Sequence, residues 1–173
     1  MLKRIAIALL ILIFVAPTAA LGQTRRRTPR SRPAQPSTQR VSQVRTAGAT
    51  RVADQIKLMT RFVYLLGGIA NGIATVDEAA RRNEASPELL QRNQQNKVTV
   101  RTSIQGFREG LDKLEIDFRA TPDLQPYYIK LAGSAAGAAK AEEQAAAGQF
   151  DAAGRTLLTV INRLTDVLVV MRQ

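Results

Sequence analysis

The 173-residue chain contains no cysteine, no histidine and no tryptophan. Without cysteine there can be no disulfide, no thiol nucleophile and no lipid attached to a cysteine. Without histidine there is no imidazole base, and the usual zinc, haem and di-iron ligand sets cannot be assembled. The composition therefore gives no candidate catalytic, cofactor-binding or metal-binding residue, and it predicts a protein that is not an enzyme.

Aromatic residues are also scarce, at 5% of the chain, while apolar residues make up 45% and are mostly Ala, Val, Leu and Ile. This balance favours packed helices over a β-sandwich. We therefore predict an all-α fold.

The net charge of +11 is distributed very unevenly. Residues 23–51 carry eight arginines and no acidic residue, whereas residues 52–173 carry 15 basic and 14 acidic side chains. A basic tail on a nearly neutral domain favours an anionic surface, lipid or wall polymer, as its partner. It does not favour nucleic acid, because no aromatic residues are interleaved to stack on bases.

The first 22 residues have the three parts of a secretory signal peptide. Lys3 and Arg4 precede an apolar run from Ile5 to Val15, and small residues follow it. Cleavage after Ala20 or after Gly22 would suit a signal peptidase, and we expect an exported protein, periplasmic or secreted. The alternative is an uncleaved anchor in the inner membrane, because Ile5–Leu21 is only slightly shorter than the ~20 residues that span a bilayer.

Residues 23–49 are rich in Arg, Pro, Ser and Thr and cannot bury enough apolar surface to fold, so we predict a disordered linker. Its charge has two interpretations: an arm that holds the protein at an anionic surface, or a soluble spacer. For the first interpretation, the predicted contact residues are Arg25, Arg26, Arg27, Arg30 and Arg32.

Residues 50–173 are predicted to form one domain, an antiparallel four-helix bundle. The expected helices are 51–83, 87–119, 123–147 and 150–172, arranged as a long hairpin (51–119) and a shorter hairpin (123–172). Ser86-Pro87-Glu88 is a strong start signal, because it combines a capping residue, a first-turn proline and an acid. The long hairpin should extend two or three turns beyond the short one, which makes its end a candidate docking surface.

Two rows of apolar residues run side by side along 51–83. The first row is Val52, Ile56, Met59, Val63, Leu66, Ala70, Ile73 and Ala80; the second row is Leu58, Phe62, Leu65, Ile69, Val76 and Ala79. Together they predict a wide buried face, covered by residues 123–172. Gly67-Gly68 lies within this pattern and predicts a weak point in one continuous helix.

Two groups of polar or aromatic residues have a functional and a structural interpretation. Asn93 and Lys97 occupy positions of the buried type, so they either form a polar pocket or belong to a solvated helix end. Tyr64, Tyr127 and Tyr128 either line a ligand pocket between helices or are ordinary core and rim residues. Glu109, Asp112 and Glu115 alternate with basic residues, as in a charge-paired surface.

These observations predict a non-enzymatic interaction or structural module of the cell envelope, whose partner is another envelope protein or an anionic surface. The alternative is a carrier or sensor that binds a small apolar molecule between its helices.

Overall fold

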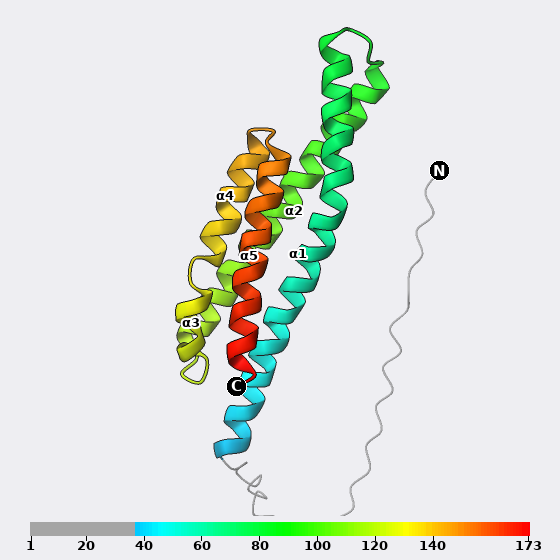
Figure 1. Cartoon of the computed structure of the whole chain (residues 1–173). Coiled ribbons are helices and arrows are strands. Elements are labelled where there is room, and N and C mark those ends of the chain that lie inside the picture. The colour runs from blue at the N-terminus through cyan, green and yellow to red at the C-terminus, as the bar shows by residue number, and fades with distance from the viewer. Residues whose placement is uncertain (1–36) are drawn as a thin grey trace, which may run out of the picture. The chain divides into compact units, whose positions relative to one another are not determined.

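The computed structural model describes residues 37–173, and within this range all regular structure is helical. The elements are α1 (Ser37–Arg81), α2 (Pro87–Ala120), α3 (Gln125–Leu131), α4 (Ser134–Ala146) and α5 (Phe150–Met171) (Figure 1). The all-α prediction is confirmed for these residues. The predicted signal peptide and the five arginines of the predicted arm lie outside the described residues, so those two hypotheses stay predictions.

The four longer helices form a bundle, in which α1 packs against α2 and α5, and α4 packs against α2 and α5 (Figure 1). The short α3 lies against α2 and α5. Contacts at both ends fix how α1 pairs with α2: Arg51 forms an ion pair with Asp117, and Asp77 lies 2.7 Å from Lys97. The two helices therefore lie side by side along most of their length.

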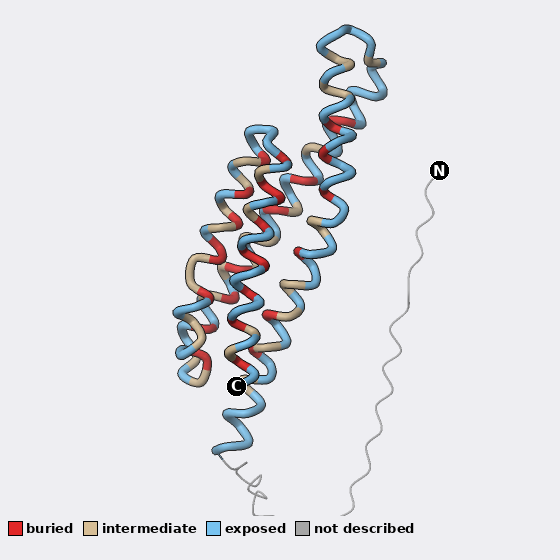
Figure 2. Tube along the Cα trace, in the orientation of Figure 1, coloured by how far each residue is buried: buried red, intermediate tan, exposed pale blue. Residues whose placement is uncertain are grey.

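The core is one continuous apolar cluster to which every helix contributes (Figure 2). Met59, Ile104 and Phe118 are completely buried, as is Leu164 of α5. On α4 the buried residues are mostly alanine, and Gly137 allows a close approach, because a Cβ there would lie 2.6 Å from Val160 Cγ2. Small residues on α4 thus let α5 pack closely against it.

The predicted start of the first helix near Thr50 is wrong, because α1 begins at Ser37. The first row continues toward the N-terminus through Gly48 and Val44. Both residues pack against the apolar core. Gly48 is buried, and a Cβ on it would lie 2.8 Å from Leu124 Cδ2. Residues 37–49, which the composition assigned to the linker, are helical because this part of α1 has apolar residues to pack against.

The single helix predicted over 123–147 is also wrong, because the chain forms α3 and α4 there. Residues 37–173 thus contain one short helix in addition to the four longer helices of the bundle. Gly133 separates them in the left-handed region, at φ +85°. That conformation ends a helix and is readily adopted by glycine. Arg163 of α5 donates to the carbonyl of Ala132 at 2.9 Å, and Glu115 accepts from the N–H of Ala135 at 2.9 Å, so neighbouring helices satisfy backbone groups at the break.

Two other predictions about the hairpin are confirmed. The helix α2 begins at Pro87, and the Ser86 side chain accepts a hydrogen bond from the N–H of Leu89 at 3.3 Å. The helix α1 is continuous through Gly67-Gly68, so these glycines do not divide it.

The expectation that both apolar rows of α1 are buried is wrong for the second row. In the first row Val52, Met59, Leu66 and Ile73 are at most 2% exposed. In the second row Leu58 is 56% exposed, Leu65 52% and Ile69 37%. Residues 123–172 cover only the first row, because α5 packs on that side of α1. In the second row Phe62 packs against Phe107 of α2, and Leu58, Leu65 and Ile69 stay exposed.

Candidate interaction surfaces of the helical hairpin

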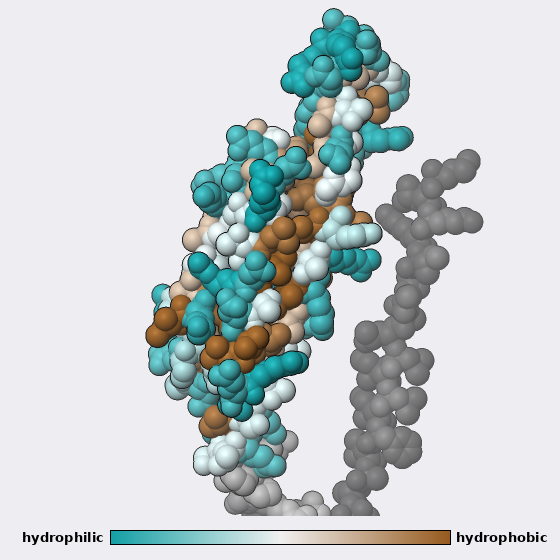
Figure 3. Space-filling model, in the orientation of Figure 1, coloured by the Kyte–Doolittle hydropathy of each residue, from teal (hydrophilic) through white to brown (hydrophobic). Residues whose placement is uncertain are grey.

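The α1–α2 hairpin extends beyond the turn between α4 and α5, as predicted (Figure 1). The last buried residue of α1 is Ile73, which lies next to Gly148 and Phe150 of that turn. From there α1 continues to Arg81, about two helical turns. We call residues 74–99 the overhang. Figure 3 shows its tip to be mostly hydrophilic.

Within the overhang a carboxylate on α1 joins two polar residues on α2. Asp77 Oδ1 accepts hydrogen bonds from Asn93 Nδ2 and from Lys97 Nζ, both at 2.7 Å. Asn93 is only 4% exposed, and the Lys97 side chain 18%. The solvated-end interpretation of Asn93 and Lys97 is therefore wrong, and both residues hold α2 in register with α1 through Asp77. We call these three residues the polar clamp.

Asn93 Oδ1 is buried and has no hydrogen-bond partner within the described residues. Leaving a buried polar atom unpaired costs about 1–3 kcal/mol. The clamp therefore contributes more to the alignment of the two helices than to their stability.

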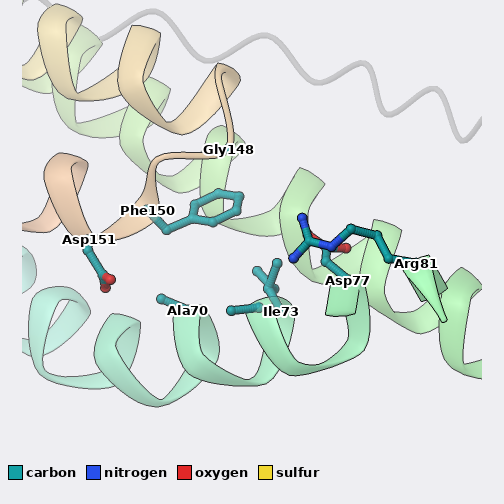
Figure 4. A pocket seen from close by; sticks show the side chains of 8 residues that line it. Ala70, Ile73, Asp77, Arg81, Gly148, Phe150 and Asp151 are labelled. Carbon is teal, nitrogen blue, oxygen red and sulfur yellow. The ribbon is translucent and has the colours of Figure 1, made fainter. Parts of the chain in front are cut away.

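A depression of about 190 Å³ lies where the overhang leaves the bundle (Figure 4). Its apolar side is formed by Ala70, Ile73 and Phe150, and its charged rim includes Asp77 and Arg81. In Figure 4 the Phe150 ring extends over α1 toward Ile73, and the Asp151 carboxylate points toward α1. Arg81 is already bonded to Glu78, with Nη2 to Oε2 at 2.7 Å. These groups do not converge on a common point, so the depression has no evident catalytic arrangement.

A second depression, about 230 Å³, lies between α1 and α5. Val63, Leu66 and Leu158 give it an apolar floor, and Gly67 and Gly154 keep it open. Figure 3 shows apolar side chains gathered along this seam. Both depressions are open to solvent, so neither resembles the enclosed pocket that a carrier of apolar molecules would need.

The tyrosines proposed for a ligand pocket are not brought together on one enclosed surface. Tyr64 is 84% exposed, whereas Tyr127 and Tyr128 are partly buried against the core. The core-and-rim interpretation therefore describes them.

The charge-paired surface interpretation of Glu109, Asp112 and Glu115 is confirmed only for Asp112. Glu109 accepts a hydrogen bond from the Gln105 amide at 2.9 Å, and Glu115 accepts one from the N–H of Ala135. Arg108 Nε lies 2.7 Å from Glu142 Oε2, and Arg108 Nη1 lies 3.6 Å from Asp112 Oδ2. The hydrogen bond to Glu142 raises the pKa of Arg108 above its ordinary value. Among residues 37–173 no three acidic side chains are grouped as a metal site would require.

The fold thus places the chain among all-α helical bundles. Comparison with known protein families, with curated proteins and with solved structures found no match to it. In the part of the chain that the structure describes, no helix is both long enough and apolar enough to cross a membrane.

Proposed function

We propose that this chain is a non-enzymatic, exported helical-bundle protein that acts as an interaction or structural module in the cell envelope. In this proposal the bundle is antiparallel, the overhang docks on another envelope protein, and the basic segment holds the molecule near an anionic surface. The observation that supports it is the projecting overhang, whose two helices are joined by the polar clamp.

The overhang suits docking because it exposes surface that the bundle does not use. The loop between α1 and α2 and the first turns of α2 are exposed, and Leu89 and Leu90 are 40% and 38% exposed. Charges of both signs surround them, including Arg81, Arg82 and Glu84. An apolar anchor with a charged rim is a common arrangement in protein–protein interfaces.

The docking proposal is tested by photocross-linking in cells. A photoreactive amino acid at Leu89 should capture one discrete partner protein, and the same residue at the exposed Thr159 of α5 should not. Equal labelling from both positions, or none from Leu89, would contradict a docking role for the overhang.

The proposed arm is tested separately with vesicles of anionic and of zwitterionic lipid. Binding should require anionic lipid and should weaken steeply with salt, because it depends on released counterions and on screening. It should be lost when five arginines are replaced by glutamine: Arg25, Arg26, Arg27, Arg30 and Arg32. Binding that survives this replacement would show that the helical domain, and not the arm, contacts the surface.

A further inference from the structure

The second apolar row of α1 has the pattern of a helix–helix contact, and most of its large residues are exposed. The exception is Phe62, whose ring packs edge-on against Phe107 of α2, with 5.1 Å between the ring centroids. Together with Gly72 the spacing of the row alternates between four and three residues, at positions 58, 62, 65, 69, 72 and 76. This seven-residue repeat keeps one face of a helix against another helix. Leu58, Leu65 and Ile69 are 56%, 52% and 37% exposed, as stated above, and a Cβ on Gly68 or Gly72 would have no neighbour within 4 Å.

The sizes of the residues in this row make it complementary to itself in the antiparallel direction. When two copies of α1 cross with residues 65 and 69 opposite each other, Phe62 of one copy faces Gly72 of the other. Leu58 then faces Val76. The open space at Gly72 lets the second copy come close to the exposed edge of Phe62, whose ring also packs against Phe107 of its own α2.

The charges beside the row favour the same direction. One flank of the row repeats every seven residues, at Asp54, Arg61, Gly68, Thr75 and Arg82. In the antiparallel pairing Asp54 faces Arg82 at both ends, Arg61 faces Thr75, and Gly68 meets its own copy. In a parallel pairing this flank of one copy lies on the opposite side of the contact from the same flank of the other copy. Asp54 and Arg82 therefore meet only in the antiparallel direction.

The side chains at the two charged ends are accessible. The Asp54 and Arg82 side chains are 56% and 58% exposed. Arg82 follows the last residue of α1 and keeps the helical spacing, because its N–H donates to the carbonyl of Glu78 at 3.2 Å. Within the chain Arg82 forms ion pairs with Glu78 and Glu84. Its Nε lies 3.8 Å from Glu78 Oε1 and 3.5 Å from Glu84 Oε2.

We propose that a second copy of this chain docks on the second row of α1, with the two α1 helices antiparallel and crossing at Gly68. The overhang of each copy then lies toward the opposite end of the dimer. This dimer is proposed separately from the docking partner and from the anionic surface; it uses the side of α1, and Arg82 lies where this side meets the overhang.

The absence of cysteine makes a cross-linking test unambiguous, because each introduced thiol is unique. The protein is prepared from residue 23 onward and treated with a short bifunctional thiol reagent. In Gly68→Cys the two thiols meet at the crossing point, so most of the protein should become covalent dimer. In Arg61→Cys each thiol faces residue 75 of the other copy, about 21 Å from its counterpart at 1.5 Å per residue, and should not cross-link. The double variant Arg61→Cys/Thr75→Cys should cross-link again.

Efficient cross-linking of Arg61→Cys alone would contradict the antiparallel pairing and overturn the proposal. The proposal would also be overturned if sedimentation gave the mass of one chain for the unmodified protein at all concentrations up to about 100 μM. The dissociation constant would then lie above about 100 μM, which corresponds to a contact weaker than about 5 kcal/mol.

Charge reversal tests the register without cysteine. Asp54→Arg replaces two attractive contacts with two repulsive ones, which should weaken dimerisation about tenfold. The double variant Asp54→Arg/Arg82→Asp restores opposite charges and should recover the original affinity. Failure of the double variant to recover, while its helical content is unchanged by circular dichroism, would overturn the Asp54–Arg82 pairing.

Discussion

The covered part of the α1–α2 hairpin and its overhang are held together in different ways, although the same two helices form both. In the covered part the contact residues are apolar, and Met59, Ile104 and Leu111 are completely buried because α4 and α5 complete the core. In the overhang only two helices meet, and the polar clamp takes the place of an apolar contact. Two helices alone cannot bury enough apolar surface to be stable, so the overhang depends on the bundle for stability and on the clamp for alignment.

The largest expected effect comes from removing an aromatic ring from the core of the covered part. Phe118→Ala should lower the free energy of unfolding by about 3–5 kcal/mol, because a completely buried phenyl ring leaves a cavity. Ile116→Ala, two residues away and 55% exposed, should change it by less than about 0.5 kcal/mol. Urea unfolding measures both. Equal losses would mean that the exposed side of α2 is also packed.

A smaller and more local effect is expected from the clamp. Asp77→Ala leaves Asn93 and Lys97 without their shared acceptor, at a cost of about 1–3 kcal/mol. Amide hydrogen exchange should become faster within residues 77–97 and stay slow around Ile104. The control is Asp112→Ala, since the partly exposed Arg108–Asp112 pair within α2, at 3.6 Å, should be worth less than about 1 kcal/mol. Uniformly faster exchange through the bundle would contradict the division into two parts.

The smallest expected effect is a pH dependence at the start of α2. The carboxylate of Glu88 is bonded to its own backbone N–H and to the Ser86 hydroxyl, which lowers the pKa of Glu88. A pKa lowered by folding contributes stability that is full above the unfolded value, about 4.3, and is lost as the pH falls through the folded value. Glu88→Gln should therefore speed amide exchange in the first turn of α2 at pH 7 and have little effect at low pH. A difference that grows on acidification would contradict this assignment.

Local signals in the sequence predicted local structure well. Ser86-Pro87-Glu88 places the start of α2 correctly, because a cap, a proline and an acid act on neighbouring residues. The start of α1 was missed, because it depends on residues that are distant in the sequence: Gly48 packs against Leu124 and Met171, and Val44 packs against the core. The end of α3 was also missed, because Gly133 fits either a close helix contact or a left-handed cap, and its sequence neighbours do not distinguish the two.

The candidate surfaces were only partly predictable for the same reason. The sequence indicated an overhang and marked Asn93 and Lys97 as unusual, but it could not identify Asp77 as their partner across the hairpin. It identified two apolar rows on α1, but which of them α5 covers depends on how the helices are rotated in the bundle. The seven-residue repeat was the available signal for the second row, since a helix with two such rows has two faces suited to other helices.

The uninterrupted length of α1 makes it a spacer. Its 45 residues span about 68 Å at 1.5 Å per residue. Ser37 lies at one end of this length, and the loop that follows Arg81 lies at the other. A partner bound at the loop is therefore about this far from the first residue of α1. Removing seven residues from α1 would shorten the separation by about 10 Å while keeping each face of the helix in the same direction.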